Sequence, residues 1–269
     1  MCISEAVGPG ATNRFEDVKA LQILVNLNQT RFPAIAPLSE DGRWGSSTQL
    51  AIEAFQRTAL GNGSPDGRVD PHGATLAALR TGLPPDFSEA KLRGIMPRAS
   101  DTDIARFYQP TLPAMLAYGM DTPLRQAHFL AQVGHESGSF RYTEELATGA
   151  AYEGRTDLGN THSGDGTKFK GRGLIQLTGR ANYVAYGLDK GQNFTDGANP
   201  SMIARDVTLA IDVACWFWKR HSLNAVADLD DVRAVTMKVN GGLNGLADRQ
   251  DFLVRSKFFL VQPRPSTSR

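Results

Sequence analysis

The chain has 269 residues, of which 41% are hydrophobic and 21% are charged. This composition is typical of a folded globular protein and excludes wholesale disorder. Its 29 Lys and Arg against 28 Asp and Glu give a formal charge of +1, which argues against a general nucleic-acid binder. No apolar run is long enough for a membrane-spanning helix, and the cysteines Cys2 and Cys215 make no disulfide framework. The length allows one large domain or two smaller ones.

The first block, from about residue 13 to residue 83, has the spacing of a small helical domain. Apolar residues recur at helical intervals after Asp17. A second helix is predicted from Ser46 or Ser47 to about Leu60, and a third from about His72 to Leu79.

Two short segments of this block resemble each other. Asp41-Gly42-Arg43-Trp44 precedes the second predicted helix, and Asp66-Gly67-Arg68-Val69 precedes the third. Each is typical of an Asp-Gly turn in which glycine supplies a positive φ, with one apolar residue directed inward before a helix starts. Trp44 and Phe55 are predicted to be core residues.

A short linker around Pro84-Pro85 divides the chain into predicted domains 1–85 and 86–269, because paired prolines discourage a continuing helix. The second block is predicted to be mostly helical, so the fold class is mainly α. Residues 148–173 lack periodicity and form a long loop, which in a compact domain is usually functional. The tail 263–269 is predicted to be disordered. The predicted helices are Ser88–Met96, Asp101–Met120, Thr122–His135, Ser201–Lys219, Asp230–Val239 and Ala247–Leu260.

Two carboxylates stand out in the segment His135-Glu136-Ser137-Gly138-Ser139-Phe140-Arg141-Tyr142-Thr143-Glu144-Glu145. Glu136 is expected at the C-terminal end of a helix, where the negative end of the dipole disfavours a charged carboxylate and suits a general acid. One unbroken helix would place Glu145 roughly 13 Å away. A turn at Gly138 can fold the chain back, and carboxylates about 6.5–9.5 Å apart are what an inverting glycosidase needs.

Zinc-protease chemistry is excluded at this segment, because His135-Glu136 would need a second histidine where Ser139 stands. The five histidines have no cysteine partners at metal-ligand spacing. We therefore expect no metal site and no cofactor.

Two further polar segments could line a substrate site. In Gly171-Arg172-Gly173-Leu174-Ile175-Gln176-Leu177-Thr178, the alternation predicts a short extended piece that exposes Gln176 and Thr178. In Val239-Asn240-Gly241-Gly242-Leu243-Asn244-Gly245, the glycines would allow the backbone to approach a ligand closely.

Together the three segments resemble the chitinase-like glycoside hydrolases of family nineteen, and most closely the phage and prophage endolysins of that group. The resemblance covers roughly residues 88–261, and its core is the block from Gly171 to Tyr183. It implies a lysozyme-like, predominantly helical domain that cuts β-1,4 links between amino sugars with inversion.

The resemblance also implies roles for single residues. Glu136 matches the general acid, and Thr178 matches the residue that helps to hold the attacking water. Glu145 is the candidate general base, because the nine-residue spacing is like that of the endolysins and unlike that of the plant chitinases; Glu144 remains an alternative. The substrate-binding candidates are His135, Gln176, Asn182, Asn240 and Arg249.

The first block separately resembles the three-helix peptidoglycan-binding module of many wall hydrolases. The matching residues are Leu21-Gln22-x-x-Val25, Asp41-Gly42-x-Trp44-Gly45, Thr48, Ala54-Phe55-Gln56 and Asp66-Gly67. The chain is therefore expected to be an endolysin: a monomer that binds peptidoglycan, hydrolyses it and lyses cells, without binding nucleic acid or inserting stably into membranes. The alternatives are a chitinase, an effector delivered to a rival's periplasm, and a non-catalytic wall-binding protein.

Two further expectations concern the ends of the chain. Residues 1–11 lack the basic and apolar regions of a Sec signal peptide. An endolysin of this kind would be made in the host cytoplasm and act on the periplasmic wall after release. At the other end, Phe258, Phe259 and Leu260 are predicted to pack into the catalytic core.

Overall fold

The computed structural model describes residues 1–33 and 35–262, so the predicted disordered tail 263–269 lies outside the described part of the chain. The chain divides into two compact units. Unit 1 joins residues 1–98 with the segment that begins at Leu253, and unit 2 comprises Ala99–Phe252. This division differs from the expected boundary at residues 85 and 86, because α4 and the C-terminal part of the last helix group with the N-terminal residues.

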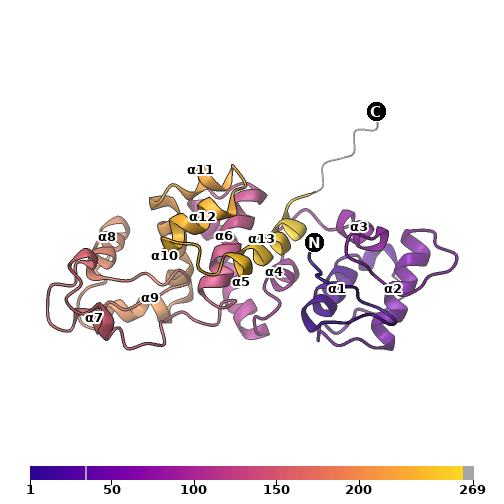
Figure 1. Ribbon diagram of the computed structural model, residues 1–269, viewed down its shortest axis with the longest axis horizontal. Helices are drawn as coiled ribbons and strands as arrows, with labels where there is room; N and C mark the ends of the chain where they lie inside the picture. Colours follow the sequence, from indigo (N-terminus) through magenta and orange to yellow (C-terminus); the bar gives the residue numbers. More distant parts are fainter. Residues whose placement is uncertain (34, 263–269) are drawn as a thin grey trace. The chain divides into compact units, whose positions relative to one another are not determined.

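Unit 1 is built around α1, whose residues from Asp17 to Val25 are all buried. It packs against α2, α3 and α4 (Figure 1). The predicted third helix begins two residues later than expected, since His72 has φ +67°, outside the helical region. Phe55 is a core residue as predicted, and Cys2 is also buried. The helices of unit 1 are α1 (Phe15–Leu27), the 3-10 helix η1 (Gln29–Arg31), α2 (Ser46–Ala59), α3 (Ala74–Thr81) and α4 (Glu89–Ile95).

The last helix, α13 (Leu246–Leu260), contributes to both units. Its phenylalanines are buried as predicted; Phe258 and Phe259 belong to unit 1, whereas Phe252 belongs to unit 2. The ring of Phe259 lies against α4, where a Cβ added at Gly94 would be 2.4 Å from it. The guanidinium of Arg80 stacks over Phe258 at 5.0 Å. The two rings therefore have neighbours on both sides of the expected boundary, since Gly94 lies in the predicted domain 86–269 and Arg80 in the predicted domain 1–85. Helical periodicity shows which residues are buried and not which neighbour covers them.

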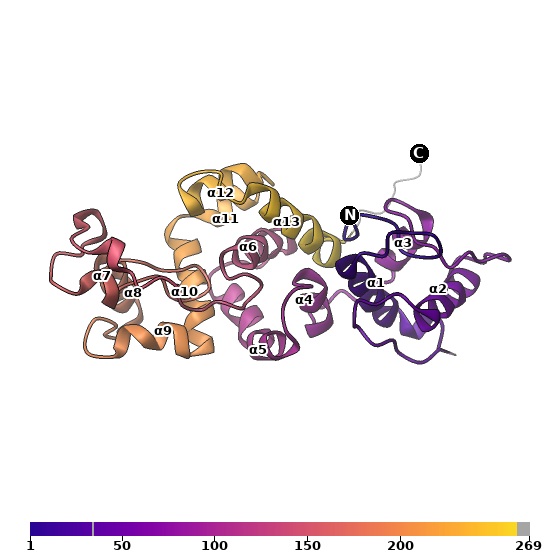
Figure 2. The same cartoon turned by 60° about the horizontal axis from the view of Figure 1, so that its bottom comes forward.

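Unit 2 is helical apart from long loops. Figures 1 and 2 show α10 between two groups: α7, α8 and α9 on one side, and α5, α6, α11 and α12 on the other. Its helices are α5 (Asp101–Ala117), α6 (Pro123–Glu136), α7 (Asp165–Lys168), α8 (Arg180–Lys190), α9 (Met202–Arg205), α10 (Val207–Arg220), α11 (Leu223–Ala227) and α12 (Val232–Asn240), with 3-10 helices η2 (Ala150–Tyr152), η3 (Thr156–Leu158) and η4 (Asn199–Ser201).

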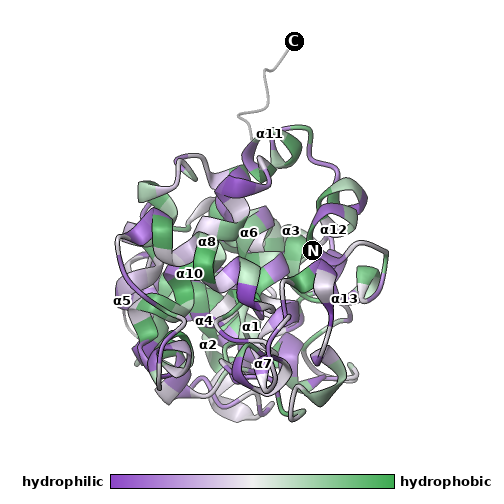
Figure 3. Ribbon diagram, turned by 90° about the vertical axis from the view of Figure 1, so that its left-hand side faces the viewer, coloured by the Kyte–Doolittle hydropathy of each residue, from purple (hydrophilic) through white to green (hydrophobic). Residues whose placement is uncertain are grey.

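Helix α6 is the central helix of unit 2, because every residue from Gln126 to Gly134 is buried. Thr122, where the sequence predicted this helix to start, caps its N-terminus by accepting a hydrogen bond from the Arg125 N–H. Hydrophobic residues gather along α6 and α10, whereas the segment around α7 is mostly hydrophilic (Figure 3).

The single helix predicted over Ser201–Lys219 is two helices in the structure. Asp206 separates α9 from α10, and its carboxylate accepts hydrogen bonds from the N–H groups of Thr208 and Leu209. A capping aspartate therefore starts a new helix where periodicity alone predicted a continuous one. Helices α8 and α11 were not predicted.

The prediction of a short extended piece at Ile175–Thr178 is wrong. An isolated bridge pairs Arg172 with Leu177, and the residues between them form a turn in which Gln176 has φ +57°. The alternation of buried Leu177 with partly exposed Gln176 and Thr178 is real, but it comes from this turn. In the described part of the chain, no helix is long and apolar enough to cross a membrane.

Candidate active site

Glu136 is the last residue of α6, and the chain reverses directly after it. Gly138, Ser139 and Phe140 all have positive φ. The Ser137 hydroxyl stabilises the reversal by donating to the Val133 carbonyl and accepting from the Phe140 N–H. Phe140 is fully buried and stacks on Phe107. The predicted turn at Gly138 is therefore present.

A buried arginine holds the Glu136 carboxylate. The guanidinium of Arg249 donates to a Glu136 carboxylate oxygen and to the side-chain oxygen of Gln132. The Arg249 side chain is 0% exposed, whereas that of Glu136 is 19% exposed. Arg249 is thus placed to position Glu136 from behind, while Glu136 keeps part of its surface for a ligand.

A second contact ties the same two helix ends together. His135 Nδ1 lies 2.7 Å from a carboxylate oxygen of Asp248. Gly245 packs against this histidine so closely that an added Cβ would lie 2.1 Å from the ring. Consecutive residues of α6 therefore contact consecutive residues of α13. In the glycine segment, Gly245 approaches His135 closely, whereas a Cβ added at Gly241 would have no atom of the described residues within 4 Å.

Glu145 is held by neutral donors. One carboxylate oxygen accepts from the Tyr152 hydroxyl at 3.0 Å, and the other accepts from the Gly171 N–H at 3.1 Å. Burial and, to a smaller extent, the hydrogen bond to Glu145 raise the pKa of Tyr152. Among the described residues, no cation forms an ion pair with the Glu145 carboxylate.

Glu144 has different partners. Its carboxylate accepts from Arg172 at 3.0 Å and lies 3.5 Å from the Lys170 ammonium. Arg172 also donates to the Tyr183 hydroxyl. Glu144 therefore belongs to a structural ion-pair network, which leaves Glu145 as the better candidate for a general base.

The polar residues of the following turn are linked to one another. The Gln176 amide donates to the Gly173 carbonyl, the Thr178 hydroxyl donates to the Gln176 carbonyl, and the Asn182 amide donates to the Thr178 carbonyl. Because Thr178 has used its only donor, its oxygen is left to accept a hydrogen bond from water. Gln176 also lies beside Gly171, where an added Cβ would be 2.9 Å from the Gln176 side-chain oxygen and 3.3 Å from Glu145.

Asn240 is exposed at the end of α12. Within the described residues, no hydrogen bond joins its side chain to the other candidates. The structure thus brings together His135, Glu136 and Arg249 in one group and Glu145 and Gln176 in another. Thr178 follows the turn that contains Gln176, and Asn182 lies in the first turn of α8.

The loop between Glu145 and Gln176 is ordered by residues that sequence reasoning missed. Asp165, 1% exposed, forms an ion pair with Arg180. This pairing lowers the pKa of Asp165 far below its usual range. Asn160 accepts from the Arg180 N–H, and Glu153 accepts from the N–H groups of Gly164 and Gly166. Asp248 and Tyr152 were also missed, because nothing in their sequence neighbourhood distinguishes them from surface residues.

A pair of carboxylates, one on a helix end and one on the loop that follows, is compatible with a glycoside hydrolase. Residues 120–232 match the family described as chitinase class I. A glycosyl hydrolase family 19 domain-containing protein of Haemophilus influenzae is 34% identical over 194 residues, which are 61% of this chain and 92% of that protein. The chain belongs to glycosyl hydrolase family 19 and is a glycoside hydrolase.

Other similarities agree with this family. An endochitinase of Arabidopsis thaliana is 41% identical over 117 residues, which are 43% of this chain but only 38% of that protein. Chitinase C from Streptomyces griseus has the same fold with a TM-score of 0.54 and 24% identity, over 64% of this chain and 91% of that one. The mainly helical fold predicted from the sequence is confirmed.

Proposed function

We propose that this enzyme hydrolyses β-1,4 glycosidic bonds of bacterial peptidoglycan with inversion and acts as an endolysin on the cell wall. The observation that carries the proposal is that Glu136, at the end of α6, and Glu145, on the loop that follows, are both held in place by hydrogen bonds and are both partly exposed. Glu136 is held through one oxygen by a buried guanidinium, and Glu145 is held by neutral donors. The resemblance to the family assigns the proton donor to Glu136 and the proton acceptor to Glu145.

In the proposed reaction, the Glu136 carboxyl protonates the glycosidic oxygen as the bond between that oxygen and the anomeric carbon breaks. A water molecule, donating one hydrogen bond to the Thr178 oxygen, attacks the anomeric carbon from the opposite face. Glu145 accepts a proton from this water. The cycle consumes one water and leaves Glu136 ionised and Glu145 protonated, and solvent exchange restores both.

Peptidoglycan is favoured as the substrate because the N-terminal residues resemble a wall-binding module. In the same proposal, unit 1 holds the enzyme on the wall while unit 2 cuts the glycan. Chitin is the second candidate, since several relatives of this chain are named endochitinases.

Product analysis separates the two substrates. Purified sacculi and colloidal chitin are digested in parallel, and the soluble products are identified by mass spectrometry. We expect muropeptides from sacculi, with α-configured new reducing ends in early NMR spectra. Chito-oligosaccharides from chitin, with no release from sacculi, would assign the enzyme to chitin instead.

A further inference from the structure

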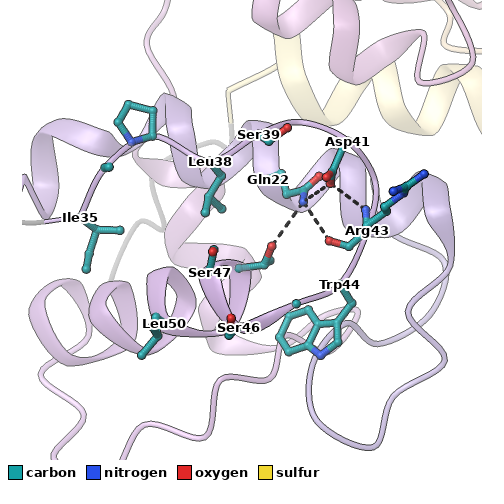
Figure 4. Close-up of a pocket in the computed structure, with 14 residues that line it drawn as sticks. Gln22, Ile35, Leu38, Ser39, Asp41, Arg43, Trp44, Ser46, Ser47 and Leu50 are labelled. Atoms are coloured by element: carbon teal, nitrogen blue, oxygen red, sulfur yellow. Dashed lines mark hydrogen bonds between the residues drawn. The ribbon is translucent and has the colours of Figure 1, made fainter.

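Unit 1 contains a cavity of about 560 Å³, within the range of small-molecule sites. It lies between the segment that leads from Ile35 to Ser39 and the start of α2 (Figure 4). The lining is mixed. Trp44, Leu38 and Leu50 supply apolar surface, and the rest of the wall includes the hydroxyls of Ser39, Ser46 and Ser47 and the charged residues Asp41 and Arg43.

The sequence repeat in unit 1 provides an internal control for this cavity. In the first copy, the buried Gln22 amide donates to Asp41, to the Arg43 carbonyl and to Thr48, and it accepts from the Gly42 N–H. In the second copy, Gln56 makes the same four contacts with Asp66, Arg68, Thr75 and Gly67. These residues therefore have a structural role that both copies share.

The two copies differ at the arginine and at the residue after it. Arg68 forms an ion pair with Asp70 at 2.9 Å, and Val69 is 0% exposed. Trp44, the counterpart of Val69, is partly exposed and lines the cavity. Among the described residues, none forms a hydrogen bond or an ion pair with the Arg43 guanidinium. The prediction that Trp44 is a core residue is therefore wrong: the first copy has both an accessible indole and an available cation.

The carboxylate closest in sequence to Arg43 does not neutralise it by an ion pair. Asp41 instead accepts from the Arg43 N–H at 2.9 Å and from the Gln22 amide at 3.0 Å. These two hydrogen bonds lower the pKa of Asp41, the backbone bond being the larger cause. Arg43 can therefore bind a carboxylate that a ligand brings.

We infer that this cavity is a binding site for an amino sugar of peptidoglycan together with a carboxylate of the attached peptide, with the pyranose ring stacked on Trp44 and the peptide carboxylate paired with Arg43. The inference rests on the proposed function, since peptidoglycan combines amino sugars with the free carboxylates of its peptides. Chitin has the sugars but lacks the carboxylates. The site would thus give unit 1 a preference for peptidoglycan over chitin.

The test measures binding of the full chain to sacculi by co-sedimentation, with Glu136→Gln in every protein so that no wall is digested. We expect Trp44→Ala to weaken binding at least about tenfold and Arg43→Ala to weaken it about five- to tenfold. Arg68→Ala is the matched control from the second copy and should bind like the parent. Because Trp44→Ala could disturb folding, Trp44→Phe is measured beside it and should weaken binding by a smaller factor.

The carboxylate is tested by amidating the free carboxyl groups of the sacculi. The parent should bind amidated sacculi as weakly as Arg43→Ala binds untreated ones, and Arg43→Ala should no longer differ from the parent. Equal binding of Arg43→Ala and the parent to untreated sacculi would overturn the site, as would an equal loss with Arg68→Ala. Cleavage of sacculi by the active enzyme is measured separately. If the enzyme cleaves sacculi but the Arg43 result is negative, the binding site fails while the proposed function stands.

Discussion

The junction of α6 with α13 and the loop from Glu144 to Asn182 each present one carboxylate, but they hold it by different physical means. At the junction, Glu136 is held by the buried Arg249, and His135 is held by Asp248. In the loop, Glu145 is held by a phenol and a backbone N–H. Helix ends can bring long charged side chains together across the core, whereas a loop positions its residues through turns and neutral donors. Because the two carboxylates share no partner among the described residues, mutations can test the role of each one separately.

The largest effect is expected at the junction. Glu136→Gln keeps the shape of the side chain but removes the proton donor, so activity on sacculi should fall by roughly 10²–10⁴. The circular dichroism spectrum should stay unchanged. Near-native lysis by a correctly folded Glu136→Gln protein would remove Glu136 from the general-acid role.

The next effect tests the loop. Glu145→Gln should reduce activity by about 10² or more, because the amide cannot accept the proton of water. Glu144→Gln is the matched control, and it should keep most activity while losing stability through its contacts with Arg172 and Lys170. If Glu144→Gln is the inactive variant, the base has to be reassigned by one position.

The order of the loop depends on Asp165, which predicts a pH effect. Since the folded-state pKa of Asp165 lies below the value of about 3.9 in an unfolded chain, its contribution to stability is present in full above that pH and is lost as the pH falls below it. Asp165→Asn should therefore cost about 1.5–3 kcal/mol at neutral pH and flatten the decline in melting temperature between about pH 4 and pH 2. An identical decline in both proteins would show that another group causes the acid sensitivity.

The smallest expected effect sharpens the comparison at the junction. Gly245 and Gly241 both have positive φ, +71° and +73°, but only Gly245 lies against His135. Gly241→Ala should cost only the strain of a left-handed alanine, about 1 kcal/mol. Gly245→Ala should cost more and also lower kcat, because the added methyl group displaces His135 beside Glu136. Equal stability and equal kcat in the two variants would mean that the histidine contact does not position the acid.

The sequence predicted the starts of two helices that have a capping hydroxyl. Thr122 caps α6 and Ser88 caps α4, and such a hydroxyl accepts a backbone N–H only a few residues away. The predictions failed where the residue that determines the structure is distant in the chain, or where the local periodicity resembles that of another element. Asp206 interrupted an apolar run that looked continuous, and the turn from Arg172 to Leu177 imitated the alternation of a strand.

The sequence by itself determined the mainly helical class, the family resemblance and the candidate carboxylates, because caps, periodicity and motifs are local. Only the tertiary structure decided which partners those residues have. Arg249 matched a cleft arginine, but it is a fully buried partner of Glu136. Phe259 has the periodicity of a core residue, but it packs against Gly94 in unit 1. A side chain's burial can be inferred from its neighbours in sequence, whereas the surface that buries it is fixed by contacts more than a hundred residues away.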